Sequence, residues 1–240
     1  MNKYLQSLWN KYFQFAWNFL KFLKLRFSRI DDSNQLTERH FSTWSQTDHQ
    51  CLEGLRVALE LLDNKKALIV ETGTSAYGTD SSRLFDSYIT RFGGRFYSVD
   101  INPRARRRLT FQHARNSHFI VSDSLSFLEN FQLKSTDIKV DLVYLDSWDV
   151  DWFNPNESAI HGYNEYLRIK DRLKSGSVIV IDDTPRTLDW IPPECVDIAL
   201  EYLRVNGVLP GKGALILKEL QGSPLVKKIW HEYNLVFQLN

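Results

Sequence analysis

Blocks of apolar residues alternate with polar ones along residues 48–240, and they predict strands that alternate with helices. Each expected strand is a short apolar run, typical of a strand that is covered on both faces of a sheet. The expected strands are residues 67–72, 95–100, 119–122, 140–145, 177–181, 214–217 and 235–239. Helical spacing and capping residues predict the helices between them. These are residues 48–62 with Asp48 as the cap, 79–91, a basic helix from Pro103, 124–131, 157–173 and 193–205.

The alternation predicts an α/β fold: a doubly wound, mostly parallel, Rossmann-like sheet of seven strands with helices on both faces. Strand–helix–strand units pair their strands in parallel through right-handed crossovers. We assign residues 33–240 to this domain. In such sheets ligands bind beyond the carboxyl ends of the strands, so the residues that follow each strand are the functional candidates.

Residues 1–32 form an aromatic and basic segment that we expect to be a helical arm. Residues 1–30 hold six Lys or Arg and no Asp or Glu. The longest uncharged run, residues 12–20, is too short to span a bilayer, which takes about twenty residues. Charges interleaved with aromatic residues do not fit a signal peptide. The arm is expected to pack on its own domain or on a second copy, with a peripheral membrane contact as the alternative.

The composition of the chain bears on its binding partners and on its cellular compartment. The chain has 240 residues and a formal net charge of +1, which gives no strong nucleic-acid signal. Its two cysteines are too few for a disulfide-rich secreted scaffold and fit a reducing, cytoplasmic compartment.

The turn after the first strand matches a dinucleotide-binding loop only in part. Gly73, Ser75 and Gly78 stand where that loop has three glycines, but a serine in the middle leaves less room for a pyrophosphate. Glu71 would repel a pyrophosphate and favours a cationic ligand instead. Both features count against a nicotinamide-dependent oxidoreductase, which is kept as an alternative hypothesis. A turn that binds no ligand is another alternative.

Polar residues also follow the second and third strands. Asp100 can accept hydrogen bonds from two ribose hydroxyls, or it can cap the next helix. Asp123 and Ser124 can hydrogen-bond an adenine amine, although Asp-Ser is also a common helix start.

Three acids follow the fourth and fifth strands: Asp146, Asp182 and Asp183. Neighbouring strands lie about 4.8 Å apart, so these carboxylates would crowd negative charge. A hard divalent cation, Mg²⁺ by default, relieves such crowding. In the alternative, Asp183 caps a turn with Thr184 and no metal binds.

Taken in order, these residues resemble the class I S-adenosylmethionine-dependent methyltransferases. The resemblance covers roughly residues 45–220 and rests on residues 70–73, Asp100, Asp123, Ser124, 142–146 and 178–183. Within the class, the chain is most similar to metal-dependent O-methyltransferases of the catechol and macrolide-sugar types. Catechol-type enzymes have Asp-Asn where this chain has Asp182-Asp183, whereas the sugar-modifying relatives have Asp-Asp.

The resemblance implies S-adenosylmethionine as the methyl donor and Mg²⁺ or another divalent cation beside it. The cofactor contacts that it implies are Glu71, Gly73, Thr74, Ser75, Asp100, Asp123 and Ser124. The cation ligands that it implies are Asp146, Asp182 and Asp183.

Transfer to oxygen requires an oriented acceptor and a base that takes the hydroxyl proton. A bound cation would lower the pKa of that hydroxyl. His161 is the first candidate for the base, with Asp146 and Asp149 as alternatives, although His161 can also be an exposed helix residue. The expected acceptor is a small or sugar-like hydroxylated molecule.

Three further hypotheses stay open. One is the oxidoreductase, another is a non-catalytic interaction module, and the third is a metal-independent methyltransferase. The last predicts that Asp182→Ala and Asp183→Ala leave activity unchanged. Residues 211–213 are expected to form a turn before a strand, which could border the active site.

Overall fold

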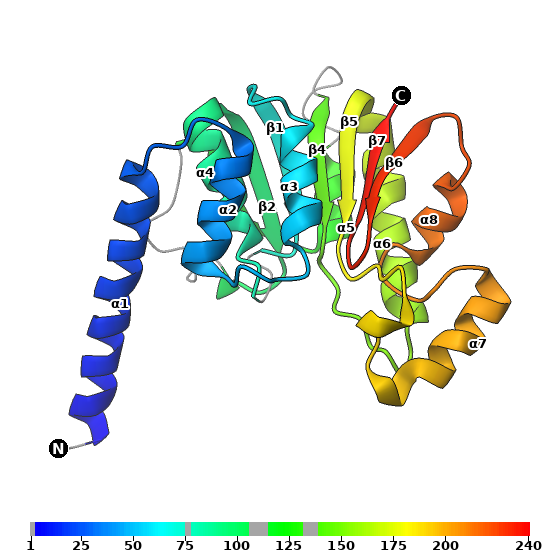
Figure 1. Cartoon of the computed structure of the whole chain (residues 1–240), viewed down its shortest axis with the longest axis horizontal. Coiled ribbons are helices and arrows are strands. Elements are labelled where there is room, and N and C mark those ends of the chain that lie inside the picture. The colour runs from blue at the N-terminus through cyan, green and yellow to red at the C-terminus, as the bar shows by residue number, and fades with distance from the viewer. Residues whose placement is uncertain (1–2, 75–77, 106–114, 132–138) are drawn as a thin grey trace.

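The computed structural model describes residues 3–74, 78–105, 115–131 and 139–240, and of residues 3–11 and 25–27 only the backbone. Figure 1 shows a central sheet between two layers of helices. The helices are α1 (Lys3–Phe27), α2 (Ser33–Trp44), α3 (Leu52–Glu60), α4 (Ser81–Phe92), α5 (Ser124–Phe131), α6 (Asn156–Ile169), α7 (Val196–Asn206) and α8 (Ala214–Leu220). The strands are β1 (Ala67–Thr72), β2 (Gly94–Asp100), β3 (Ser117–Val121), β4 (Val140–Leu145), β5 (Leu173–Ile181), β6 (Val226–His231) and β7 (Leu235–Leu239).

The described strands form one sheet of seven in the order β3-β2-β1-β4-β5-β7-β6. The first five strands are parallel to one another, and β7 runs antiparallel to both β5 and β6. The α/β, Rossmann-like prediction is therefore confirmed. The strand order reverses between β1 and β4, which places the expected ligand crevice at the carboxyl ends of these two strands.

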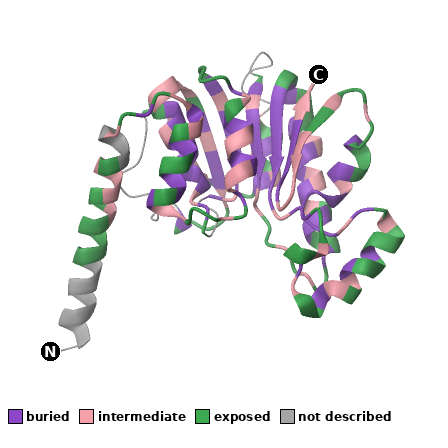
Figure 2. Cartoon of the chain, viewed as in Figure 1, coloured by how far each residue is buried: buried purple, intermediate pink, exposed green. Residues whose placement is uncertain are grey.

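Two apolar cores cover the two faces of the sheet, because successive side chains of a strand point to opposite faces. Along β4, Leu142 and Tyr144 pack with α2, α3 and α4, whereas Val143 and Leu145 pack with α5, α6 and α8. The central strands are consequently buried along their length, as Figure 2 shows. This packing fixes the strand ends that carry the candidate site.

Two element predictions near the C-terminus are wrong or incomplete. Residues 214–217 form the start of helix α8 rather than a strand, and Ile216, Leu217 and Leu220 point into the second core at helical spacing. The seventh strand is instead β6, which carries Lys227 and Lys228 at the sheet edge. Lysines are common on edge strands because they discourage pairing with another chain.

Two helix predictions also differ from the structure. Asp48 does not cap a helix, because α3 begins only at Leu52, with Cys51 as its N-cap residue. The segment 33–44, for which no element was predicted, forms α2, and its N-cap Asp32 accepts a 2.9 Å hydrogen bond from the backbone N–H of Gln35. The basic helix expected from Pro103 falls largely on residues 106–114, which lie outside the described residues.

Helix α1 stands at the edge of the molecule and meets the rest of the chain near its C-terminal end (Figure 1). The ammonium of Lys21 lies 5.3 Å from the ring centroid of Trp44 in α2. Tyr12, Phe13 and Trp17 are each at least half exposed. The expected helix is therefore present, but this part of it does not pack on its own domain. None of the helices in the described ranges is long and apolar enough to cross a membrane.

Candidate active site

The loop after β1 lies between the ends of β2 and β4. The backbone N–H of Gly73 donates a 2.9 Å hydrogen bond to the carbonyl of Val99, and the N–H of Asp146 donates a 3.0 Å bond to the carbonyl of Thr72. Gly73 has a φ of 83°, and a Cβ atom there would collide with the carbonyl oxygen of Asp146. Glycine is required on both counts.

Asp100 sits at the other side of this loop, at the end of β2. Its Oδ2 accepts a 3.1 Å hydrogen bond from the N–H of Thr74, and its Oδ1 accepts a 2.6 Å bond from the N–H of Asn102. These bonds fix the carboxylate against the Gly73 loop. Asp100 and Asp146 therefore flank the same loop on one edge of the sheet, as a nucleoside pocket at the switch point requires.

Glu71 lies inside the protein rather than at its surface. It is fully buried, and its carboxylate accepts hydrogen bonds from the hydroxyls of Ser81 at 2.5 Å and Ser98 at 2.6 Å, and from Ser82. Burial raises the pKa of Glu71 to about 7, although the serine hydroxyls oppose the shift. Glu71 thus ties β1 to β2 and to the start of α4. A direct contact with the cofactor stays a prediction.

The predicted adenine contacts lie at the start of α5. Asp123 caps this helix, because its Oδ1 accepts a 2.8 Å hydrogen bond from the N–H of Ser126, and this bond lowers the pKa of Asp123. Ser124 is buried and its hydroxyl lies 3.1 Å from Nε2 of His161. The predicted contact at Ser75 lies outside the described residues.

His161, on α6, joins a small polar network below the end of β4. Its Nε2 lies 2.9 Å from Oγ of Ser147, and that hydroxyl donates a 2.7 Å bond to Glu165. The ring of Trp148 lies 5.0 Å from the His161 ring. His161 is therefore a largely enclosed residue beside Ser124 and Ser147 and not an exposed helix histidine, whereas Asp149 is exposed.

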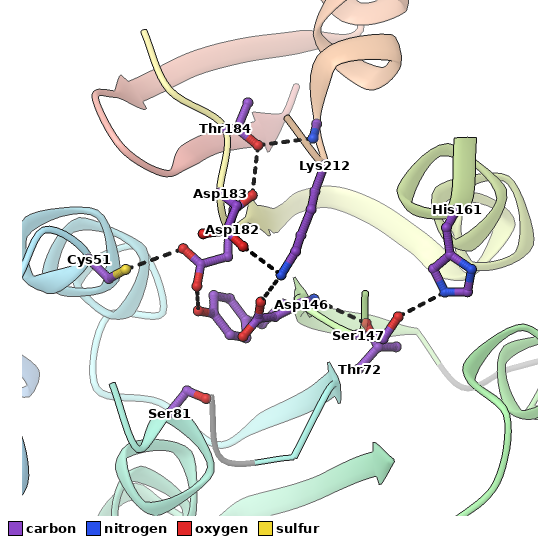
Figure 3. Close-up of polar contacts among 12 residues, drawn as sticks. Cys51, Thr72, Ser81, Asp146, Ser147, His161, Asp182, Asp183, Thr184 and Lys212 are labelled. Atoms are coloured by element: carbon purple, nitrogen blue, oxygen red, sulfur yellow. Dashed lines mark hydrogen bonds and ion pairs between the residues drawn. The ribbon is translucent and has the colours of Figure 1, made fainter. Parts of the chain in front are cut away.

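The three predicted cation ligands do come together, but around a lysine (Figure 3). The ammonium of Lys212 forms an ion pair with Asp146 and lies 2.9 Å from Oδ2 of Asp183. The side chain of Lys212 is only 3% exposed. Burial alone would lower the pKa of Lys212, but the carboxylates of Asp146, Asp183 and Asp182 outweigh burial and raise it.

Three more carboxylate oxygens, those of Asp182 and Oδ1 of Asp183, also have protein donors. The thiol of Cys51 lies 3.2 Å from Oδ1 of Asp182, and the hydroxyl of Tyr144 donates a 2.7 Å bond to its Oδ2. The hydroxyl of Tyr233 donates to Oδ1 of Asp183. Among the described residues, no three His, Cys, Asp or Glu side chains are arranged to hold a metal ion. As they stand, these side chains do not fit a divalent cation in addition to Lys212.

Local sequence patterns hardly indicate the residues that surround the carboxylates. Tyr144 lies inside an expected strand, Cys51 near the start of an expected helix, and Tyr233 in the turn before the last strand. The turn at residues 211–213 was the one signal for Lys212, since it was expected to border the site. Each of these contacts joins segments that are far apart in the chain, so no local pattern predicts it.

Comparison with known proteins agrees with this geometry. Residues 70–184 match the family model described as a methyltransferase domain. No curated protein sequence matches the chain. The matched range covers the Gly73 loop and every candidate residue from Asp100 to Asp183. Residues 70–184 therefore belong to a methyltransferase domain, and the chain has the fold of the class I S-adenosylmethionine-dependent methyltransferases.

Among solved structures, the chain is similar to MycE, a methyltransferase of the mycinamycin biosynthetic pathway. It aligns with MycE in complex with Mg and SAH at a TM-score of 0.56 and 16% identity, over 89% of this chain and 56% of that one. It also aligns with MycE bound to Mg, SAH and mycinamycin VI at a TM-score of 0.54 and 18% identity, over 89% and 54%. The chain thus spans little more than half the length of MycE, and at this identity the likeness shows the fold.

Proposed function

We propose that this methyltransferase transfers the methyl group of S-adenosylmethionine to a hydroxyl oxygen of a small or sugar-like acceptor. The observation that carries the proposal is the Gly73 loop held between Asp100 and Asp146 at the switch point of the sheet. MycE binds mycinamycin VI together with Mg and SAH in one of its structures, which supports a small-molecule acceptor for this chain.

In this proposal the chain's own residues bind and orient the donor. Asp100 accepts hydrogen bonds from the ribose hydroxyls, and the backbone at Gly73 lies along the methionine part of the donor. Ser124, beside His161, borders the adenine. The buried acids beyond Gly73 favour the positive sulfonium over a neutral or anionic ligand, because opposite charges attract strongly where water is excluded.

The transfer itself is an in-line displacement. The acceptor oxygen forms a bond to the methyl carbon as the carbon–sulfur bond breaks, and the hydroxyl proton passes to a base. His161 stays our first candidate for that base. Its Nε2 lies beside the hydroxyl of Ser147, the residue that follows Asp146 in the sequence. Asp146 is the second candidate. Asp149 is the third, and its exposure makes it the one most easily reached by water.

The test is methyl transfer from isotope-labelled S-adenosylmethionine to a panel of phenols, sugars and glycosylated macrolides. We expect a methyl ether product, detected by mass spectrometry. We also expect His161→Gln to lower kcat strongly and to change KM much less. A labelled amine or thiol product with no ether would overturn transfer to oxygen. Binding of NADH in place of the labelled donor would favour the oxidoreductase.

A further inference from the structure

We propose that the ammonium group of Lys212 takes the place of a divalent cation in this site, so that the site works without a metal ion. The inference rests on the proposed function for the use of the site. The experiment below measures metal binding and not methyl transfer. The inference about Lys212 can therefore be wrong while the proposed methyl transfer is right. Figure 3 shows the lysine reaching in between the ends of β4 and β5.

Backbone contacts of Lys212 and Gly213 fix the position of the Lys212 side chain. Its N–H donates a 3.0 Å hydrogen bond to the carbonyl of Asp183, and the N–H of Gly213 donates a 3.0 Å bond to the hydroxyl of Thr184. A Cβ atom at Gly162 of α6 would lie 2.5 Å from the carbonyl oxygen of Lys212. The loop is thus clamped between β5 and α6, and this backbone position directs the side chain into the carboxylates.

Five of the six carboxylate oxygens that would coordinate a cation are already engaged by the protein. Lys212 pairs with Asp146 and with Oδ2 of Asp183, while Cys51 and Tyr144 occupy both oxygens of Asp182. Mg²⁺ demands near-ideal octahedral geometry from oxygen ligands at about 2.0–2.1 Å. A divalent ion would therefore have to displace a buried ammonium and break several of these hydrogen bonds.

The charges in the site also disfavour binding of a divalent cation. Buried carboxylates need a paired positive charge, which Lys212 supplies from within the chain. A second cation at the same point would face the ammonium across a few ångströms of low-dielectric protein. The lysine thus neutralises part of the acidic cluster and holds Asp146 and Asp183 in place, as a cation would.

The test is Mn²⁺ binding to the full chain, followed by electron paramagnetic resonance of free Mn²⁺. We expect no stoichiometric binding to the wild type, and S-adenosylhomocysteine affinity that is unchanged by EDTA. Lys212→Ala should open the position and raise Mn²⁺ affinity by about tenfold or more, because a repelling charge is gone. Lys218→Ala, an exposed lysine of α8, is the matched control and should change nothing.

Two outcomes would overturn this inference. One is stoichiometric Mn²⁺ binding by the wild type that is lost in Asp182→Asn. The other is a folded Lys212→Ala protein, shown by an unchanged circular dichroism spectrum, that gains no Mn²⁺ affinity. If Lys212→Ala does not fold, Lys212→Met keeps the length of the side chain without its charge and takes its place in the test.

A different observation carries a second proposal: we infer that α1 lies on an anionic lipid surface. Phe13, Trp17 and Leu20, at helical spacing, share one face and are 64%, 50% and 58% exposed. Gln14, Asn18 and Lys21 follow at the same spacing on the next face. Tyr12, Phe15 and Phe19 are exposed as well, so the polar strip runs along a helix that is otherwise rich in exposed aromatic residues. Exposed aromatic residues together with Lys and Arg are typical of helices that lie in a membrane interface.

The positive charge of residues 1–30 favours a lipid surface with anionic headgroups. Residues 1–30 hold six basic residues and no acidic one, whereas the rest of the chain is net acidic. A basic segment is attracted to anionic headgroups, and the attraction weakens as salt rises. Two basic arms repel each other, so this charge disfavours a dimer in which the arms of two copies pack together.

The test is cosedimentation of the full chain with phosphatidylcholine vesicles that contain or lack phosphatidylglycerol. We expect binding to the anionic vesicles alone, weakened by salt and lost in the double variant Phe13→Ser with Leu20→Ser. Leu225→Ser, which changes an exposed leucine elsewhere, is the control and should bind like the wild type. Equal binding to both vesicles, or binding to neither, by a monomer or by a stable dimer, would overturn the inference.

Discussion

Asp100 is the residue through which the chain would recognise a ribose. Its carboxylate is held by the N–H groups of Thr74 and Asn102, so it is oriented before any ligand arrives. A hydrogen bond to a charged group contributes about 1.5–3 kcal/mol. Asp100→Asn should therefore weaken S-adenosylhomocysteine binding about ten- to a hundredfold in a calorimetric titration. Asp197→Asn, at an exposed position of α7, should bind like the wild type.

Glu71 should make the stability of the protein depend on pH. Its pKa is raised by burial from 4.5 to about 7 in the folded chain. Between these values the folded state binds more protons than the unfolded state, so the free energy of unfolding falls as pH rises. Relative to Glu71→Gln, the wild type should lose about 3 kcal/mol across this window, measured by urea unfolding. A difference that is the same at both ends of the window would contradict the burial of an ionisable Glu71.

The residues that could be identified from the sequence share one property: they directly follow apolar strands. Asp100, Asp146 and Asp182 could be found because a strand end is a local pattern and the strand order then places them together. Lys212 and Tyr233 could not be found in this way. Their contacts with the carboxylates depend on how α8 and β7 fold back over β5, which no spacing in the chain reveals.

At the scale of elements, the turn that leads into α8 positions Lys212. Gly213 has little room, because a Cβ atom there would lie 2.7 Å from Oγ1 of Thr184 and 2.9 Å from its Cγ2. Gly213→Ala should lower the free energy of unfolding by about 1–3 kcal/mol through overpacking. Urea unfolding measures this loss, with Gln221→Ala at the exposed end of α8 as a control. An unchanged midpoint for Gly213→Ala would mean that the turn is not clamped.

The strands in the centre of the sheet and the edge strand β3 could be predicted, but the opposite edge strand β6 could not. The strands that end at Thr72, Leu145 and Ile181 are continuous apolar runs, as burial on both faces demands. Residues 214–217 are just as apolar, but a short apolar run does not distinguish a buried helix from a strand. Strand β6 was missed because lysines interrupt it, and a solvent-facing edge tolerates them.

Across the whole molecule, the proposed donor site is formed by loops from both halves of the sheet. A ligand that binds there joins the ends of β1, β2 and β4 and stabilises only the folded chain. At a concentration of about one hundred times Kd, such a ligand adds about 2.7 kcal/mol. For a chain of this length we expect S-adenosylhomocysteine to raise Tm by about 5–10 °C. No rise at saturating ligand would contradict a pocket that spans these strands.

We expect the Gly73 loop, held between Asp100 and Asp146, to bind a sulfonium nucleoside. Isothermal titration of the full chain with S-adenosylmethionine, and separately with NADH, tests it most directly. Saturable binding of one S-adenosylmethionine per chain, with no heat from NADH, is the predicted result. Saturable binding of NADH, with none of S-adenosylmethionine, would show that the loop holds a dinucleotide rather than a sulfonium nucleoside.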